Sequence, residues 1–247
     1  MITNKEISYV LTDRQRCDLE LLITGAFSPL QGFMDEAQWQ AVCQTGRLPD
    51  ASLWPIPITL DIDEVCAQQL SAGSELRLER SDGTPLAICT VSSVYRPDRL
   101  WESRCVYGTD DPLHPGVALL LAQKPYNVAG SVTPYDREAF SRAAVMEFPP
   151  EYLRPSELRS MGFKGPLLAF QTRNPLHHAH IAVTQEAMRQ LGTDATLLLQ
   201  PAIGPTKPGD IDASARMRAY RAALRYYPAG QVILTALPLA MRMAGPR

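Results

Sequence analysis

The start of the chain lacks the features of a targeting or membrane-spanning segment. Residues 1–20 mix charged side chains with short apolar pairs. They contain neither the apolar core of a signal peptide nor a run long enough to cross a bilayer. This absence predicts a soluble, cytoplasmic protein that binds no membrane. With 247 residues, 45% of them hydrophobic, the chain can form a sizeable core.

Cysteine is sparse, and its spacing argues against two common kinds of chemistry. The five cysteines are odd in number, and no two of them form a Cys-x-x-Cys pair (Cys17, Cys43, Cys66, Cys89 and Cys105). Such spacing favours neither a zinc site nor a redox centre, and we expect reduced, mostly buried thiols. The common nucleotide-binding fingerprints are also missing, because no G-x-G-x-x-G occurs and GPTKPGD at 204–210 departs from the P-loop order.

Histidine is scarce but concentrated in one place. Three of the four histidines (His177, His178 and His180) lie in the segment QTRNPLHHAH, residues 171–180. No metal site is expected there, because the fourth histidine lies in the first part of the chain and no cysteine follows Cys105.

Charge is unevenly distributed along the chain. Residues 161–247 hold ten basic and four acidic side chains, whereas residues 1–160 hold 14 basic and 22 acidic ones. Anion binding is therefore expected in the second part, although any one of these arginines could instead lie exposed on a helix. The acidic first part has the wrong sign for a phosphate backbone, so RNA and DNA are not expected partners.

The first part of the chain has the pattern of a small, mostly antiparallel β domain. Apolar and alternating runs between 53 and 96, with a Ser-Asp-Gly-Thr turn at 81–84, predict its strands. Helices are expected at 18–22 and from about residue 35, and the polar segment 98–115 is expected to be a loop.

A segment rich in proline and glycine, 148–165, is typical of a linker. We place the domain boundary within it, which gives domains 1–158 and 159–247.

The second part has the alternating pattern of a parallel α/β sheet. Strand, helix, strand, helix and strand are expected in that order (166–171, 178–191, 195–203, 211–227 and 231–239). The first run, PLLAFQ, is typical of a strand covered on both faces. Ligands of such sheets bind at the carboxyl ends of the strands, where the segments 171–180 and 204–210 both lie.

The polar segment after the first strand combines a helix start with imidazoles. Asn174 can cap free N–H groups, and Pro175 loses no hydrogen bond at a first helical position. His177 and His180 then share one helix face, and His178 points elsewhere. A helix start attracts phosphate through its N–H groups and dipole, and the two imidazoles add donors.

Arg173, at the strand end, offers a planar fork suited to a tetrahedral or carboxylate anion. Gln171 and Thr172 add neutral polar contacts. A His-x-x-His pair alone is more often structural than functional, and Lys207 in the next loop could simply face solvent. The combination of Gln, Arg, Asn, Pro and two histidines at one turn favours an anion site.

These segments resemble the ATP sulfurylase (sulfate adenylyltransferase) family. Its hallmark Gln-Thr-Arg-Asn-Pro-x-His-x-x-His is complete between Gln171 and His180, and the likeness continues through GPTKPGDI and LPLAMRMAGPR. DLELLITGAFSPLQGFM, LWPIPITLDI and YGTDDPLHPGV resemble that family's PUA-like domain. The resemblance implies an α/β protein in which an N-terminal PUA-like mixed β domain precedes a Rossmann-like, nucleotidyltransferase-type parallel α/β domain.

The resemblance also implies a reaction. A sulfate oxygen would attack the α-phosphorus of MgATP directly and reversibly, giving adenosine 5′-phosphosulfate (adenylylsulfate) and pyrophosphate. Mg²⁺ would arrive with ATP, and no protein-bound metal is expected. No serine, threonine or cysteine stands in an obvious nucleophile–base pair, which suits a reaction governed by position and charge.

The family pattern assigns roles to three overlapping groups of side chains. Sulfate is expected at two residues (Gln171 and Arg173). The expected catalytic residues all lie in the same segment (Thr172, Arg173, Asn174, His177 and His180). ATP is expected to contact that segment and the following loop (Gln171, Thr172, Arg173, Asn174, His177, His180, Lys207 and Asp210). His178 departs from the family, in which Arg is common at this place.

In the family the chain continues past AGPR into a Gly-Arg-Asp-His-Ala-Gly-Pro motif that grips adenosine. The sequence as given therefore predicts a catalytic domain truncated before that motif. The alternative is a catalytically inactive ATP sulfurylase-like structural or regulatory domain, or a fragment of a protein fused to adenylylsulfate kinase. The intact QTRN and His-x-x-His residues favour the enzyme, for which a homo-oligomer and a fusion or association with that kinase are expected.

Overall fold

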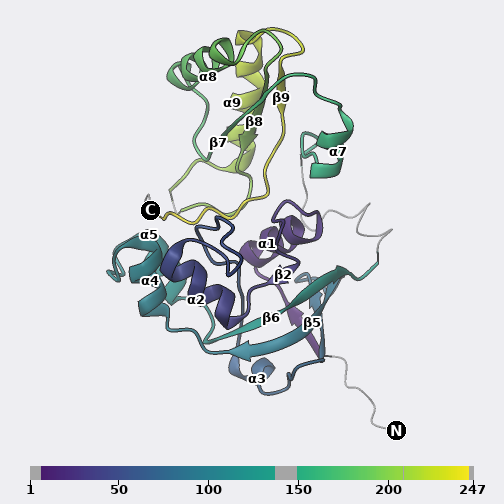
Figure 1. The fold of residues 1–247 in the computed structure, drawn as a ribbon, viewed down its shortest axis with the longest axis vertical. Helices are drawn as coiled ribbons and strands as arrows, with labels where there is room; N and C mark the ends of the chain where they lie inside the picture. The colour runs from purple at the N-terminus through teal and green to yellow at the C-terminus, as the bar shows by residue number, and fades with distance from the viewer. Residues whose placement is uncertain (1–6, 137–148, 208, 245–247) are drawn as a thin grey trace. The chain divides into compact units, whose positions relative to one another are not determined.

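The computed structural model describes residues 7–136, 149–207 and 209–244. The chain divides into two compact units, which are coloured along the sequence in Figure 1. Unit 1 comprises Met1–Val145 and Arg242–Arg247, and unit 2 comprises Met146–Met241. The domain boundary at residue 158 stays a prediction.

Unit 1 is built on a mixed β-sheet. Among the described residues the sheet has six strands (β1 Ile7–Val10, β2 Gly32–Phe33, β3 Leu60–Ile62, β4 Glu75–Glu79, β5 Pro85–Tyr95 and β6 Tyr126–Pro134). Their order is β1-β4-β5-β6-β2, and β3 also pairs with β6. β1 pairs with β4 in parallel, whereas the other pairs are antiparallel. The expected mostly antiparallel unit is confirmed, and the 81–84 turn does connect two of its strands.

Short helices accompany this sheet (α1 Asp13–Ile23, α2 Glu36–Thr45, α3 Glu64–Ala67, α4 Arg99–Tyr107 and α5 Pro115–Leu121). Thr12 and Asp35 cap α1 and α2 through capping boxes, in which a glutamine three residues later bonds back to the cap. Fully buried leucines from α1, β3 and β4 form part of one core (Leu19, Leu60, Leu76 and Leu78). Arg242, near the end of the described chain, donates to buried Asp18 of α1 at 2.6 Å within the same unit.

Several expectations for unit 1 need correction. The helix expected at 18–22 extends over Asp13–Ile23, and of the expected strand 54–62 only Leu60–Ile62 forms a strand. The expected loop 98–115 contains α4, which Asp98 caps by accepting from the Trp101 N–H at 2.9 Å. The sequence pattern did not indicate α4 because the buried face of this helix is partly polar. On that face Glu102 accepts a hydrogen bond from the Trp39 indole at 3.0 Å.

The expectation that the thiols are mostly buried is confirmed. All five thiols are free, four of them are buried and Cys105 is half-buried. Burial raises the pKa of Cys66 to about 11 and that of Cys89 to about 12, so both stay protonated at neutral pH.

Unit 2 has the expected alternation of strands and helices. In the part of the chain that the structure describes, its sheet has three parallel strands in the order β7-β8-β9 (β7 Leu167–Thr172, β8 Thr196–Pro201 and β9 Val232–Leu234). α8 (His178–Leu191) follows β7, whereas α9 (Ala213–Ala223) and a 3-10 turn, η1 (Leu224–Tyr226), follow β8. A short helix, α7 (Pro155–Ser160), lies within the expected linker. The expected fold class, a mixed β unit followed by a parallel α/β unit, is confirmed.

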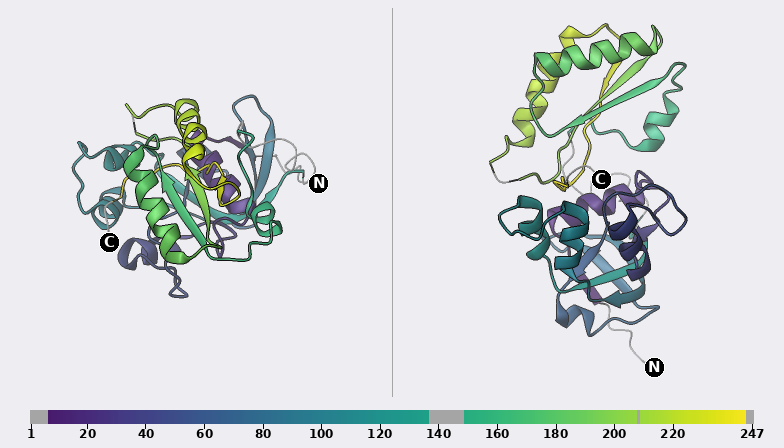
Figure 2. Two further views of the ribbon diagram at one scale, coloured as in Figure 1. Left: turned by 90° about the horizontal axis from the view of Figure 1, so that it is seen from above. Right: turned by 60° about the vertical axis from the view of Figure 1, so that its left-hand side comes forward.

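The helices α8 and α9 cover one face of the unit 2 sheet, and the right-hand view of Figure 2 shows both on the same side of the strands. Leu168 and Phe170 of β7 pack into the core beneath these helices, with Leu197 and Leu199 of β8. On the opposite face Leu167 is 48% exposed. Within the described residues the expectation that β7 is covered on both faces is therefore wrong, because Leu167 and Ala169 on this face are exposed.

Among the described residues, no helix is both long enough and apolar enough to span a membrane.

Candidate active site

The two polar segments that the sequence singled out follow neighbouring parallel strands. β7 and β8 run in register from Leu167 opposite Thr196 to Thr172 opposite Pro201, so both strands end at the same edge of the sheet. Just beyond, the Ala202 N–H donates to the Thr172 carbonyl at 3.1 Å. The segment 171–180 and the loop 203–210 therefore both start at the edge where parallel sheets bind ligands.

Arg173 is held by a carboxylate from the second of these segments. Its Nη1 lies 2.8 Å from Oδ1 and 2.5 Å from Oδ2 of Asp210. Burial acts to raise the pKa of Asp210, but the hydrogen bonds and charge of Arg173, helped by Thr206 and Lys207, outweigh it, so the net pKa is lowered. The pair keeps Asp210 ionised and fixes the guanidinium.

The Arg173 guanidinium keeps one edge available. Both contacts to Asp210 use Nη1, and within the described residues Nε and Nη2 make no hydrogen bond to protein. The Nε/Nη2 edge is the one that binds carboxylate-like and phosphate-like anions through two parallel hydrogen bonds. The Arg173 side chain as a whole is 24% exposed.

His177 and His180 meet as the sequence predicted. Their ring centroids lie 3.7 Å apart with an interplanar angle of 30°, which is a stacked pair. His180 also packs against Phe170 of β7 at 5.5 Å. Burial, and then the charge of His177, lower the pKa of His180, so the ring is neutral at physiological pH.

The His180 ring has an unused polar atom. Its Nδ1 is buried and has no hydrogen-bond partner among the described residues. A neutral imidazole has one N–H donor and one acceptor nitrogen, so the His180 ring can offer one N–H group to an anion.

The expected helix start at Asn174 is wrong. α8 begins at His178 with His177 as its N-cap, and no side chain caps it. Asn174 is exposed, and its backbone N–H donates to the Thr172 hydroxyl at 3.1 Å. This local bond forms a tight turn before the helix. Asn174 therefore takes part through its backbone N–H in the turn, and its side chain does not cap α8.

The remaining predicted residues are also placed. Gln171 lies at the end of β7 with its Nε2 3.4 Å from the Met241 sulfur. Lys207 is half-buried in the following loop, and its carbonyl accepts from the Asp210 N–H at 3.2 Å. His178 turns to Tyr226, at a ring distance of 5.5 Å, and so points away from the His177–His180 pair as expected.

Sequence reasoning missed one residue near this site, Arg216 of α9. It is 2% exposed and donates to the carbonyl of Ala202, where β8 ends. The pattern RMRAYR gives no sign of which arginine is buried, because charged residues on a helix usually face solvent.

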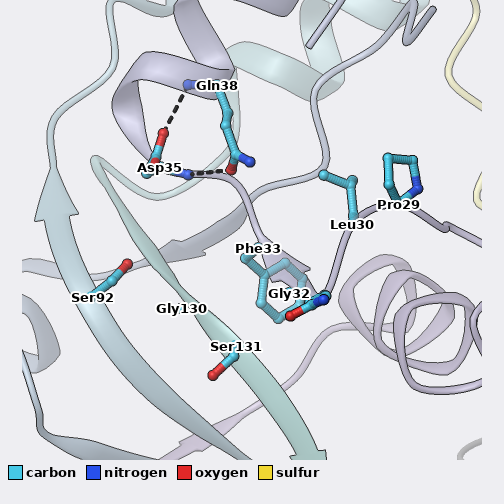
Figure 3. Close-up of a pocket in the computed structure, with 10 residues that line it drawn as sticks. Pro29, Leu30, Gly32, Phe33, Asp35, Gln38, Ser92, Gly130 and Ser131 are labelled. Atoms are coloured by element: carbon cyan, nitrogen blue, oxygen red, sulfur yellow. Dashed lines mark hydrogen bonds between the residues drawn. The ribbon is translucent and has the colours of Figure 1, made fainter. Parts of the chain in front are cut away.

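No group of three or more His, Cys, Asp or Glu side chains that could hold a metal occurs within residues 7–136, 149–207 and 209–244. A hollow of unit 1 lies beside β2 (Figure 3) and has a volume of about 270 Å³. Its Asp35 and Gln38 are engaged with each other's backbone N–H groups in capping α2, at 2.8 and 3.2 Å. It contains none of the predicted site residues.

Comparison with known proteins matches both parts of the chain. Residues 3–137 match the family model of a PUA-like domain, and residues 148–247 match that of ATP-sulfurylase. A sulfate adenylyltransferase from Saccharomyces cerevisiae is 41% identical over 242 residues, or 96% of this chain. One from Chaetomium globosum is 44% identical over 245 residues, also 96% of this chain.

The chain belongs to the ATP sulfurylase family. Its match covers 46% of the length of the first relative and 41% of the length of the second, so the chain spans less than half the length of either relative. A solved structure described as a hexameric APS kinase from Thiobacillus denitrificans is also similar, with a TM-score of 0.72 and 28% identity. That match covers 98% of this chain and 43% of the other. The family resemblance inferred from the sequence motifs is confirmed.

Proposed function

We propose that the chain carries the sulfate- and phosphate-binding half of a sulfate adenylyltransferase, which converts ATP and sulfate to adenylylsulfate and pyrophosphate, reversibly. The observation that supports this most is the turn between β7 and α8. It presents a guanidinium with a free edge and a stacked pair of imidazoles within eight residues of sequence. Sulfate adenylyltransferase relatives at 41–44% identity support the same reaction class.

The proposed chemistry needs no covalent enzyme intermediate. A sulfate oxygen forms a bond to the α-phosphorus, the bond from that phosphorus to the bridging oxygen breaks, and pyrophosphate leaves with the electron pair. Arg173 would hold sulfate on its Nε/Nη2 edge, with Gln171 as a neutral neighbour. Thr172 and Asn174 would line the reacting centre.

The imidazoles of His177 and His180 would donate hydrogen bonds to the phosphate oxygens on which charge develops. Lys207 and Asp210 would lie near the nucleotide. Mg²⁺ would enter with ATP and neutralise charge on the leaving phosphates. The chain's own part is to place two anions together and to favour the charge distribution of the transition state.

Sulfate-dependent release of pyrophosphate from MgATP tests this proposal. We expect release that needs sulfate and that falls to background when sulfate is omitted. A folded chain with no sulfate-dependent release would contradict enzymatic activity and leave the alternative, a non-catalytic module of the family.

Association also belongs to this proposal. The APS kinase of similar structure is described as hexameric. APS stands for adenosine 5′-phosphosulfate, so the name of that kinase gives adenylylsulfate as its substrate. We expect the chain to form homo-oligomers in the cytoplasm and to work with an adenylylsulfate kinase, by fusion or by contact. Light scattering on purified protein would give the mass, and a monomer at micromolar concentration would contradict the oligomer.

A further inference from the structure

Arg216 closes the base of the loop that carries Lys207 and Asp210. Its Nη2 donates to the Ala202 carbonyl at 2.8 Å, and its Nη1 donates to the Ile211 carbonyl. Ala202 and Ile211 flank the loop 203–210 on its two sides. One guanidinium thus links the two ends of the loop through hydrogen bonds, and we call this pair of bonds the clasp.

Both partners of this clasp are backbone carbonyls. Within the described residues Arg216 forms no ion pair with a carboxylate, and its Nε, although buried, has no hydrogen-bond partner. Burial lowers its pKa, and the nearby charges of Asp210 and Asp212 oppose that effect only in part. An arginine remains protonated in proteins, so a full positive charge lies buried here without a direct counter-charge.

The surroundings of this charge point to an anionic ligand. Asp210, the closest acidic influence, already shares its carboxylate oxygens with Nη1 of Arg173. Three cations (Arg173, Lys207 and Arg216) therefore act on two carboxylates, Asp210 and Asp212, and neither carboxylate forms an ion pair with Arg216 among the described residues. Unbalanced positive charge in a partly desolvated site attracts anions and is costly to keep for packing alone.

We propose that Arg216 is a positioning residue for the anion site: it clasps the loop 203–210, and thereby holds Asp210 and its partner Arg173 in the geometry that binds sulfate. This proposal rests on the proposed function for the identity of the anion. Its structural part, the clasp, can be measured without turnover.

The test compares three variants of the whole chain: Arg216→Met, Arg216→Lys and, as a matched control on the same helix, Arg218→Gln. Arg218 is exposed and bonds only to the Ser214 hydroxyl among the described residues, at 3.2 Å. Hydrogen–deuterium exchange of the loop amides measures whether the clasp is intact. The KM for sulfate, compared with the KM for MgATP, measures the effect of the clasp on sulfate binding.

In Arg216→Met we expect amide exchange in 203–211 to rise by about tenfold while exchange in α8 stays unchanged. We expect the KM for sulfate to rise by about tenfold, with a smaller change for MgATP. Arg216→Lys should keep both the raised exchange and the raised sulfate KM, because an ammonium lacks the two spread donors that bond to the Ala202 and Ile211 carbonyls, and Arg218→Gln should behave like the unsubstituted chain.

Unchanged exchange in 203–211 of a folded Arg216→Met chain would overturn the proposal. So would an equal rise of the sulfate and MgATP KM values in both Arg216 variants. If Arg216→Met does not fold, exchange in Arg216→Lys decides in the same way. Absence of turnover in the unsubstituted chain would contradict the proposed function alone, since the exchange result still decides the clasp.

Discussion

At the scale of single residues, the site depends on how one side chain divides its donors. Asp210 occupies Nη1 of Arg173 and leaves the Nε/Nη2 edge for a ligand. The carboxylate therefore orients the guanidinium without blocking the edge suited to sulfate. A lysine at this position could supply the charge but not the two parallel donors.

Arg173→Ala should lower sulfate-dependent pyrophosphate release by at least about a hundredfold, because both charge and two donors are lost at the reacting centre. Far-UV circular dichroism should remain unchanged. Arg189→Ala is the control, since Arg189 is an exposed arginine of α8 paired with Glu186. Near-normal turnover in Arg173→Ala would show that sulfate binds elsewhere.

His177→Ala should lower kcat by about a hundredfold, the loss typical of one preorganised donor to a developing charge. His178→Ala is the matched control, because that ring turns to Tyr226. Steady-state kinetics of both variants give the answer. Equal kcat values for His177→Ala and His178→Ala would contradict this role and indicate that the stacked pair is only structural.

The lowered pKa of His180 predicts a pH dependence of stability. The folded state resists protonation of this ring, whereas the unfolded chain takes up a proton near the ordinary pKa of 6.5. Its contribution to the free energy of unfolding is therefore fully present above pH 6.5 and is lost as the pH falls toward the lowered pKa. Urea unfolding of the native chain and of His180→Gln, measured from pH 8 to pH 5, should show the loss only in the native chain, and parallel curves would contradict it.

At the scale of helices and strands, the sequence predicted unit 2 better than unit 1. Apolar runs such as LLL at 197–199 form a strand buried on both sides, and Gly192 ends α8 where the periodicity ends. α4 escaped prediction because Glu102 and Ser103 are buried on its inner face and disguise its helical period. The helical spacing from His178 gave the start of α8 correctly, whereas the expected cap at Asn174 is wrong, because the helix begins four residues after it.

The stacking of His177 on His180 does not arise from a shared helix face, because His177 is the N-cap of α8 and lies outside the helix. The position of Arg173 at a strand end follows from the spacing of the apolar run before it. The partnership of Arg173 with Asp210 does not, because it joins residues 37 apart in sequence through the loop after β8. Long-range pairs of this kind depend on the register of the parallel strands. One sequence does not reveal that register.

The cap of α9 gives a prediction at this scale. Asp212 accepts from the Ala215 N–H at 2.9 Å and so satisfies a free donor at the helix start. Asp212→Ala should lower the free energy of unfolding by about 1 kcal/mol, and Asp212→Asn, which can still cap, by less. Urea denaturation of the two variants measures the difference. Equal losses would show that charge rather than capping matters.

At the scale of the whole molecule, the chain combines a PUA-like unit with a parallel α/β unit. It spans less than half the length of the two relatives compared above. The proposed function places a single anion site within unit 2, at the end of β7 and the start of α8. Arg173 and the two histidines must then respond together to a ligand that carries both a sulfate and a phosphate.

Titration with adenylylsulfate, followed by ¹⁵N NMR, tests this most directly. We expect the Arg173 Nε signal and the imidazole nitrogen signals of His177 and His180 to shift along one binding curve with a common dissociation constant, while the His178 signals stay unchanged. Shifts of Arg173 without the histidines, of the histidines without Arg173, or along curves with different constants would contradict it.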